Sequence, residues 1–138
     1  MEQAKKSAFK FKNFIVEESH IKQKPGKRGE YKIKLLPHGT IYKQKNVFQL
    51  DLVVEINEPN KNFYSKIHAI GVFEFEAKTE KKELDNYFLV NAPAIIFPYI
   101  RAHIASLTAL SGTGAINLPP LNLASLRNQL KENIDEVD

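Results

Sequence analysis

Histidine and acidic side chains are the first candidates for chemistry in this 138-residue chain. The four histidines are His20, His38, His68 and His103. None lies three or four residues from another and none belongs to an H-E-x-x-H motif, so the sequence lacks the spacing that places two metal ligands on one helix face. Asp51 and Glu55 fall on one face of a predicted strand. Carboxylates in such positions more often belong to a solvent-exposed sheet face than act as an acid–base pair. We therefore expect no metal site and no cofactor.

The motifs of nucleophilic catalysis and phosphate binding are also missing. With no cysteine, thiol catalysis, disulfides and thiolate metal sites are excluded. Ser106 and Ser111 lack the G-x-S-x-G pattern of a nucleophile elbow. The glycine-bearing residues 111–114 follow a predicted helix, so they cannot offer a helix N-terminus to a phosphate. No catalytic residue is predicted, and the chain is not expected to be an enzyme.

Length and composition predict a single folded domain over residues 1–138. Apolar residues make up 43% of the chain, which suffices for one hydrophobic core at this size. Pro98, Tyr99 and Arg101 interrupt the longest apolar stretch, and no apolar segment with a cleavage site follows Met1. Neither a membrane span nor secretion is predicted, and the composition favours a cytoplasmic protein.

Positive charge is concentrated in the first third of the chain. Residues 1–45 carry 12 Lys/Arg and 4 Asp/Glu, whereas residues 46–138 carry 8 and 12. A basic half is typical of proteins that bind nucleic acid or an anionic surface. Here the lysines alternate with apolar residues, as in Phe9-Lys10-Phe11-Lys12, which favours the wet face of a strand. A polyanion site is the alternative.

Alternation of apolar and polar residues predicts four strands, over residues 8–17, 30–42, 47–57 and 63–76. Lys12-Asn13 indicates a bulge in the first strand, and Pro37 belongs at a sheet edge or a bulge. Gly71 leaves room for a bulge or a close approach of another backbone.

The period changes to that of a helix after residue 78. Thr79 is the predicted N-cap of a short helix that ends at Val90, and a long helix follows that begins at Pro93 or at Pro98. A last amphipathic helix is predicted over residues 124–134, followed by an acidic tail that frays. Strands first and helices afterwards predict an α+β fold with helices on one face of an antiparallel sheet.

Several apolar side chains fall on the predicted outer faces of the strands, namely Val53, Tyr64, Ile70 and Val72. A contiguous exposed apolar patch marks a partner surface or an oligomer interface. Scattered surface hydrophobes are the ordinary alternative.

Two segments of the last third carry a family resemblance. Residues 92–107 (APAIIFPYIRAHIASL) resemble the central helix of the SecB protein-export chaperones, which has a proline-led apolar run, F-P-Y-x-R and then I-x-S. After a glycine linker, residues 118–126 (LPPLNLASL) resemble that family's L-x-P-V-N-F-x-A-L segment. Residues 8–90 are similar to the family in strand pattern.

The resemblance implies an ATP-independent chaperone that keeps unfolded or precursor polypeptides competent for export or folding. It implies a four-stranded antiparallel sheet with two helices packed on one face, assembled as a tetramer that is a dimer of dimers. It also implies an apolar polypeptide-binding groove at Tyr31, Ile33, Leu35, Leu123 and Leu126. The corresponding oligomer contacts would be Tyr64, Lys66, Ile70, Ile100, Ile104 and Leu107.

The chain departs from the family at the surface that docks the motor SecA, which is acidic in the family. Glu18 keeps one such position, but Lys22 and Lys66 fall where the family carries acidic residues. The departure argues against SecA as a partner and leaves open a client outside export, such as the antitoxin of a toxin–antitoxin system.

Two other classes of function compete with a chaperone. A single-stranded nucleic-acid-binding module would use Phe9, Phe11 and Tyr31 as stacking platforms. Its cationic residues would be Lys10, Lys12, Lys22, Lys24, Lys27, Arg28, Lys32 and Lys34. A small-molecule or catalytic domain ranks last, because no cluster of polar residues converges.

Overall fold

A computed structural model describes residues 8–112, 114–120 and 122–138, apart from the side chain of Leu123. The antiparallel part of its sheet consists of β1 (Phe9–Gln23), β2 (Lys32–Tyr42), β3 (Val47–Asn57) and β4 (Phe63–Phe75). A fifth strand, β5 (Ile134–Val137), pairs in parallel with β2 and gives the strand order β1-β4-β3-β2-β5. The fold is α+β as predicted, with five strands where four were expected.

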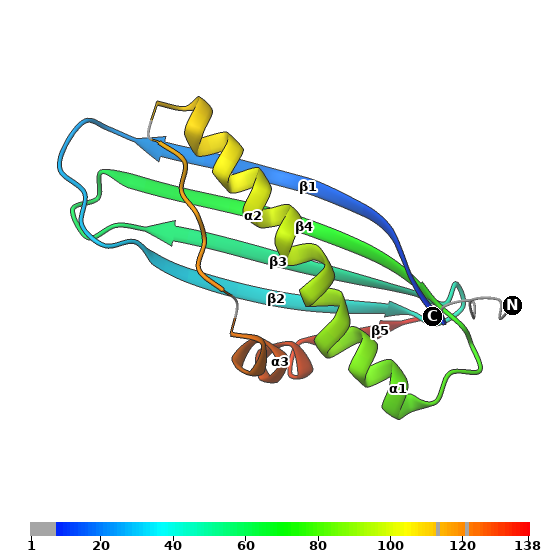
Figure 1. The fold of residues 1–138 in the computed structure, drawn as a ribbon. Helices are drawn as coiled ribbons and strands as arrows, with labels where there is room; N and C mark the ends of the chain where they lie inside the picture. The colour runs from blue at the N-terminus through cyan, green and yellow to red at the C-terminus, as the bar shows by residue number, and fades with distance from the viewer. Residues whose placement is uncertain (1–7, 113, 121) are drawn as a thin grey trace, which may run out of the picture.

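One continuous helix, Lys81–Leu110, crosses one face of the sheet obliquely (Figure 1). It is composed of α1 (Lys81–Asn86), a π-helical turn η1 (Tyr87–Asn91) and α2 (Ala92–Leu110). Helix α3 (Leu123–Lys131) lies on the same side of the sheet, next to β2 (Figure 1). The prediction of helices on one face is confirmed, and the other face carries no helix within the described part of the chain.

The long helix begins at neither of the two prolines, because Pro93 and Pro98 both lie inside it. Proline lacks an N–H and its ring clashes with the preceding turn, so it disfavours a regular α-helix. The chain accommodates Pro93 by widening the helix just before it, where the Ala92 N–H donates to the Tyr87 carbonyl in a π-helical turn. The expected break into two helices is therefore replaced by a local change of helical type.

The start and the end of this helix agree with the sequence to within two residues. Glu80 is the N-cap, one residue after the predicted Thr79, and its side chain forms no capping bond. The helix ends at Leu110, and Gly112 follows with a φ of 80°, a left-handed conformation that glycine adopts without strain.

The core lies between the inner face of the sheet and α2. On β3, Phe48, Leu50, Leu52, Val54 and Ile56 are 0% exposed. They belong to one hydrophobic cluster with three isoleucines at helical spacing on α2 that are equally buried, namely Ile96, Ile100 and Ile104.

Gly71 of β4 sets how closely the helix approaches the sheet. A Cβ atom at this position would lie 2.5 Å from Cγ2 of Ile96, so a larger residue would push α2 away. A bulge or a close approach of another backbone was predicted at Gly71, but the atom that approaches it belongs to the side chain of Ile96. Strand β4 keeps regular register there with both neighbouring strands, so Gly71 forms no bulge.

By length and composition, Lys81–Leu110 is the one helix among the described residues that could cross a membrane, with a mean hydropathy of 1.3 over its most apolar window. Its apolar side chains are needed for the core of the protein, because 44% of the most apolar part of the helix is buried. A core helix packed on a sheet satisfies the same criteria, so this helix is weak evidence for a span.

The C-terminal residues form a strand, and the prediction of a fraying tail is wrong. Helix α3 ends at Lys131, and β5 then pairs with residues 39–42 of β2. Two side-chain contacts hold it, a hydrogen bond between His38 and Asp135 and an ion pair between Lys43 and Glu136, each at 2.9 Å. A hydrogen bond from Lys43 to Glu136 and the negative charge of that carboxylate raise the pKa of Lys43. Strand pairing thus gives the acidic residues side-chain partners that local sequence does not reveal.

The turn between β3 and β4 is organised by the carboxylate of Glu58, which is 4% exposed. It accepts backbone N–H groups of Gly29 and Asn60, each at 3.0 Å, and a third from Asn62. Burial works to raise the pKa of Glu58, but the three backbone hydrogen bonds and the nearby Arg28 outweigh it and lower the pKa below its ordinary 4.5.

Because its pKa is lower in the folded state, ionised Glu58 contributes stability above pH 4.5 that is lost as the pH falls through the folded value. We expect Glu58→Gln to destabilise the protein at neutral pH and to flatten the acid limb of a plot of unfolding free energy against pH. Urea unfolding at several pH values measures this. Acid limbs of equal slope in the two proteins would contradict the assignment.

Candidate functional site

Two adjoining hollows lie where the edge of β2 meets α3 and the segment before it. The larger, of about 450 Å³, lies against α3 and is lined by Ile33, Lys34, Leu35, Leu36, Asn122, Ser125, Leu126 and Gln129. The smaller, of about 170 Å³, is lined by Ile33, Leu35, Phe97, Leu118, Pro119, Pro120 and Asn122. Because the hollows share Ile33, Leu35 and Asn122, we treat them as one groove and call it the β2 groove.

The segment between α2 and α3 forms one wall of this groove. It returns across the helix-covered face towards β2 (Figure 1), anchored by the buried side chains of Ile116 and Leu118. The Ile116 N–H donates to Oγ1 of the buried Thr108 at 2.8 Å, which fixes the segment to α2. Asn122 then caps α3 by accepting the Ser125 N–H at 3.2 Å, a standard capping bond.

The structure brings together three of the five residues predicted for the groove. Ile33 and Leu35 line both hollows, and Leu126 lines the larger one although its side chain is only 2% exposed. Tyr31 does not line either hollow, because its ring packs edge-on against Phe63 at 5.6 Å. The side chain of Leu123 lies outside the described residues.

Sequence reasoning missed part of the lining, most clearly Phe97, Leu118 and Pro119. The alternation of apolar Ile116 and Leu118 with polar Asn117 was the signal available in the sequence. This pattern did not reveal which strand the segment crosses, so its residues could not be assigned to the groove from the sequence.

The edge of β2 that borders the groove has no strand partner between Lys32 and His38 among the described residues. The Gly39 N–H donates outward to Asn133 at 2.9 Å, and backbone groups of alternate residues point to the same side of a strand. Ile33 and Leu35 therefore direct their backbone groups to the open edge. Pro37, which has no N–H, lies in this unpaired stretch, as predicted for a strand proline.

The residues predicted for oligomer contacts divide into two groups. Tyr64, Lys66 and Ile70 lie partly buried on the sheet face that carries no helix. Ile100 and Ile104 are 0% exposed in the core of a single chain, so neither can reach a second copy in this conformation, and their placement in an interface is corrected. Leu107 of α2 is partly buried.

The other apolar residues predicted for the outer face also lie on it. Val53 and Val72 are partly buried there. Ile15 of β1 and Leu36 of β2, which the sequence did not single out, are more exposed, at 43% and 39%. By strand register Ile15 is the neighbour of Ile70, and Leu36 is the neighbour of Val53.

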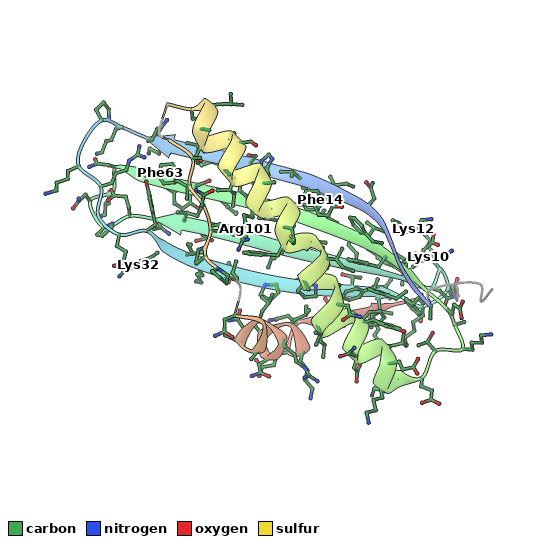
Figure 2. The ribbon with its side chains drawn as sticks, viewed as in Figure 1. Lys10, Lys12, Phe14, Lys32, Phe63 and Arg101 are labelled. Atoms are coloured by element: carbon green, nitrogen blue, oxygen red, sulfur yellow. The ribbon has the colours of Figure 1, made fainter. Side chains whose placement is uncertain are left out.

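The basic residues do not form one continuous track. Figure 2 shows Lys10 and Lys12 at one end of the sheet and Lys32 at the other. Phe9, a predicted stacking platform, is 8% exposed and stacks on Phe73 at 4.8 Å, so it is not available to a base.

Comparison with known proteins places the chain in a family. The sequence model described as "Preprotein translocase subunit SecB" matches residues 16–133, which is most of the chain. The chain belongs to the SecB family.

Two curated relatives carry the name "Protein-export protein SecB". The one from Buchnera aphidicola is 33% identical over 102 residues, covering 64% of this chain and 66% of the relative. The one from Ehrlichia ruminantium is 33% identical over 84 residues, covering 55% and 48%. The chain thus spans about half to two thirds of the length of these relatives. An uncharacterized protein of Methanocaldococcus jannaschii is 27% identical over 145 residues, covering 99% of this chain and 93% of the relative.

Among solved structures, a SecB-like chaperone of Mycobacterium tuberculosis, in complex with a ChAD peptide from an antitoxin, has a similar fold. Its TM-score is 0.71 at 12% sequence identity, covering 83% of this chain and 88% of that one. This likeness establishes the fold, and together with family membership it supports a chaperone role.

Proposed function

We propose that this protein is an ATP-independent molecular chaperone that holds unfolded polypeptide in the β2 groove. The observation that carries the proposal is that Ile33 and Leu35 line a groove with both apolar and polar walls, and that the strand edge at the same residues is unpaired within the described part of the chain. Apolar surface binds side chains of many sequences, and a strand edge binds any extended backbone. A chaperone for varied clients needs both, and no reaction centre.

The geometry favours a client segment in extended conformation. Such a segment would pair with β2 near Ile33 and Leu35 and lie in line with β5, which already pairs with residues 39–42. Alternate side chains would enter the groove, since those of a strand point to opposite faces. Exposed Lys32 and Lys34, of which Lys34 lines the larger hollow, would attract acidic residues of the client.

For the client we propose precursor polypeptides kept competent for export, in keeping with the name of the curated relatives. A non-export client such as an antitoxin is the alternative, supported by the antitoxin peptide bound to the similar chaperone of Mycobacterium tuberculosis. SecA is the less favoured partner, because exposed Lys22 and partly buried Lys66 give its expected docking face positive charge.

We further propose that the chain works as one domain in the cytoplasm, assembled as a homotetramer built as a dimer of dimers. Tyr64, Lys66, Ile70 and Leu107 remain the candidates for contacts between copies. Repetition of weak grooves in one particle raises the avidity for a long unfolded chain.

Mass measurement in solution, with and without a permanently unfolded polypeptide, tests this proposal. We expect a particle of four chains that gains the mass of the client without added nucleotide. A monomer that binds no unfolded polypeptide would exclude the chaperone.

A second candidate, binding of single-stranded nucleic acid, is favoured by a hollow of about 680 Å³ at one end of the sheet. Lys22, Lys24, Lys61 and Tyr64 are among its lining residues. Such binding would weaken steeply as salt is raised. If a labelled oligonucleotide does not bind at low ionic strength, this candidate is excluded.

A further inference from the structure

Three ligand-type side chains meet on the sheet face that carries no helix, on the opposite side from the β2 groove. They are Glu17 of β1, Asp51 of β3 and His68 of β4, from three neighbouring strands. Nε2 of His68 lies 2.7 Å from Oδ2 of Asp51, and its Nδ1 lies 3.6 Å from Oε2 of Glu17. The side chains of His68 and Asp51 are 23% and 20% exposed, and that of Glu17 is 57% exposed.

A β-bulge brings Glu17 into this cluster. Val16 is opposite Ala69 and Glu18 is opposite His68, so the register shifts at Glu17, which has no residue opposite it on β4. Bulges of this kind redirect a side chain and recur beside functional sites. The first bulge of β1, at Lys12, was predicted from the sequence, whereas this second one was not.

Asp51 is held in place by a second contact. Its Oδ1 accepts a hydrogen bond from Nε2 of Gln49 at 2.9 Å, which leaves Oδ2 directed at His68. Two members of the cluster are therefore fixed on the rigid sheet, and the more exposed Glu17 is free to adjust.

The cluster contains two carboxylates, which carry negative charge, and one imidazole ring. A neutral imidazole has one N–H, so one of the two carboxylates facing His68 would meet a lone pair instead of a donor. Among the described residues no lysine or arginine forms an ion pair with Glu17 or Asp51. By register the nearest further titratable groups are Glu18, opposite His68, and His38, opposite Asp51, and His38 is already paired with Asp135. A bound metal ion would supply a positive charge between the two carboxylates.

We propose that Glu17, Asp51 and His68 form a binding site for a divalent transition-metal ion of the Zn²⁺ class. One imidazole nitrogen with two carboxylate oxygens is a ligand set that Zn²⁺ accepts, with metal–ligand distances of about 2.0–2.2 Å. One ligand atom from each residue lies within 4.8 Å of the others. Because Asp51 faces Nε2 of His68 and Glu17 faces Nδ1, Glu17 must turn towards the Nε2 side of the ring for all three residues to bind one ion. Three protein ligands leave a coordination position for water or for a donor from another chain.

Titration calorimetry of the chelator-dialysed full chain with ZnCl₂ tests the site. We expect one Zn²⁺ per chain, and at least a roughly 10-fold loss of affinity in His68→Gln and in Glu17→Gln, since removing even a supporting group commonly costs that much. His20→Gln, which removes an exposed histidine outside the cluster, is the matched control and should bind as the parent does.

Thermal unfolding without metal shows whether each variant folds. If His68→Gln does not fold, the half-exposed Glu17→Gln variant decides the question. Binding well below one equivalent, or equal affinity in the parent and in Glu17→Gln, would overturn the proposal.

Discussion

Ile33→Gln is expected to weaken binding of an unfolded polypeptide by about 10-fold without unfolding the chaperone. Ile33 lines both hollows of the β2 groove and is only partly buried, so a client side chain would cover its remaining apolar surface. Burying an aliphatic side chain contributes about 1.5–3 kcal/mol, and each 1.4 kcal/mol corresponds to a factor of about 10 in affinity. Fluorescence anisotropy of a labelled, permanently unfolded polypeptide measures the change.

Ile15→Gln is the matched control for this experiment. Ile15 is the same residue type on β1, it is 43% exposed, and it lies on the sheet face away from the groove. We expect this variant to bind the polypeptide as the parent does. Equal losses of affinity in the two variants would mean that clients do not use the groove.

Ile100→Ala is expected to lower the free energy of unfolding by about 2–5 kcal/mol, the usual cost of a cavity in a packed core. Ile100 is 0% exposed and lies between α2 and the sheet. Leu110→Ala is the control on the same helix, where the side chain is 88% exposed and the cost should stay below about 0.5 kcal/mol. Urea unfolding of the two variants and the parent gives both values.

The same experiment separates a core residue from an interface residue. The stability that a contact between chains contributes depends on protein concentration, whereas the stability that a contact inside one chain contributes does not. The cost of Ile100→Ala should therefore be the same at low and high protein concentration. If the cost appears only at concentrations where the protein is assembled, Ile100 belongs to the oligomer interface that the family resemblance implies.

The strands were predictable because each buries one face. In β3, Phe48, Leu50 and Leu52 alternate with other residues and so lie on one face of the strand. A shift of one residue in the pairing would turn these side chains to the opposite face, so only one register buries them, and the structure has that register. The helix-covered face follows from the same pattern.

The long helix and β5 were harder, for physical reasons. Prolines predict helix boundaries, but tertiary packing of Ile96 and its neighbours stabilises the helix enough to continue through Pro93 and Pro98. Strand β5 is short and its two central residues are acidic, so it carries little local strand signal. It forms because β2 offers an edge with His38 and Lys43 as partners.

The candidate site was predictable in part. Family resemblance indicated Ile33, Leu35 and Leu126, which the structure brings together, but their role in client binding is a prediction. The cluster of Glu17, Asp51 and His68 could not be found from spacing, because its members come from three strands and one sits on a bulge. Ligands separated in sequence meet only through strand order, which a single sequence does not specify.

The central claim, that this chain holds unfolded protein without ATP, is tested most directly by light scattering of an aggregating client. A denatured protein is diluted into buffer with increasing amounts of the chaperone, with and without ATP. We predict that scattering falls with chaperone concentration and that the two series coincide. Scattering that is unchanged by the chaperone, or suppressed only when ATP is present, would contradict the account.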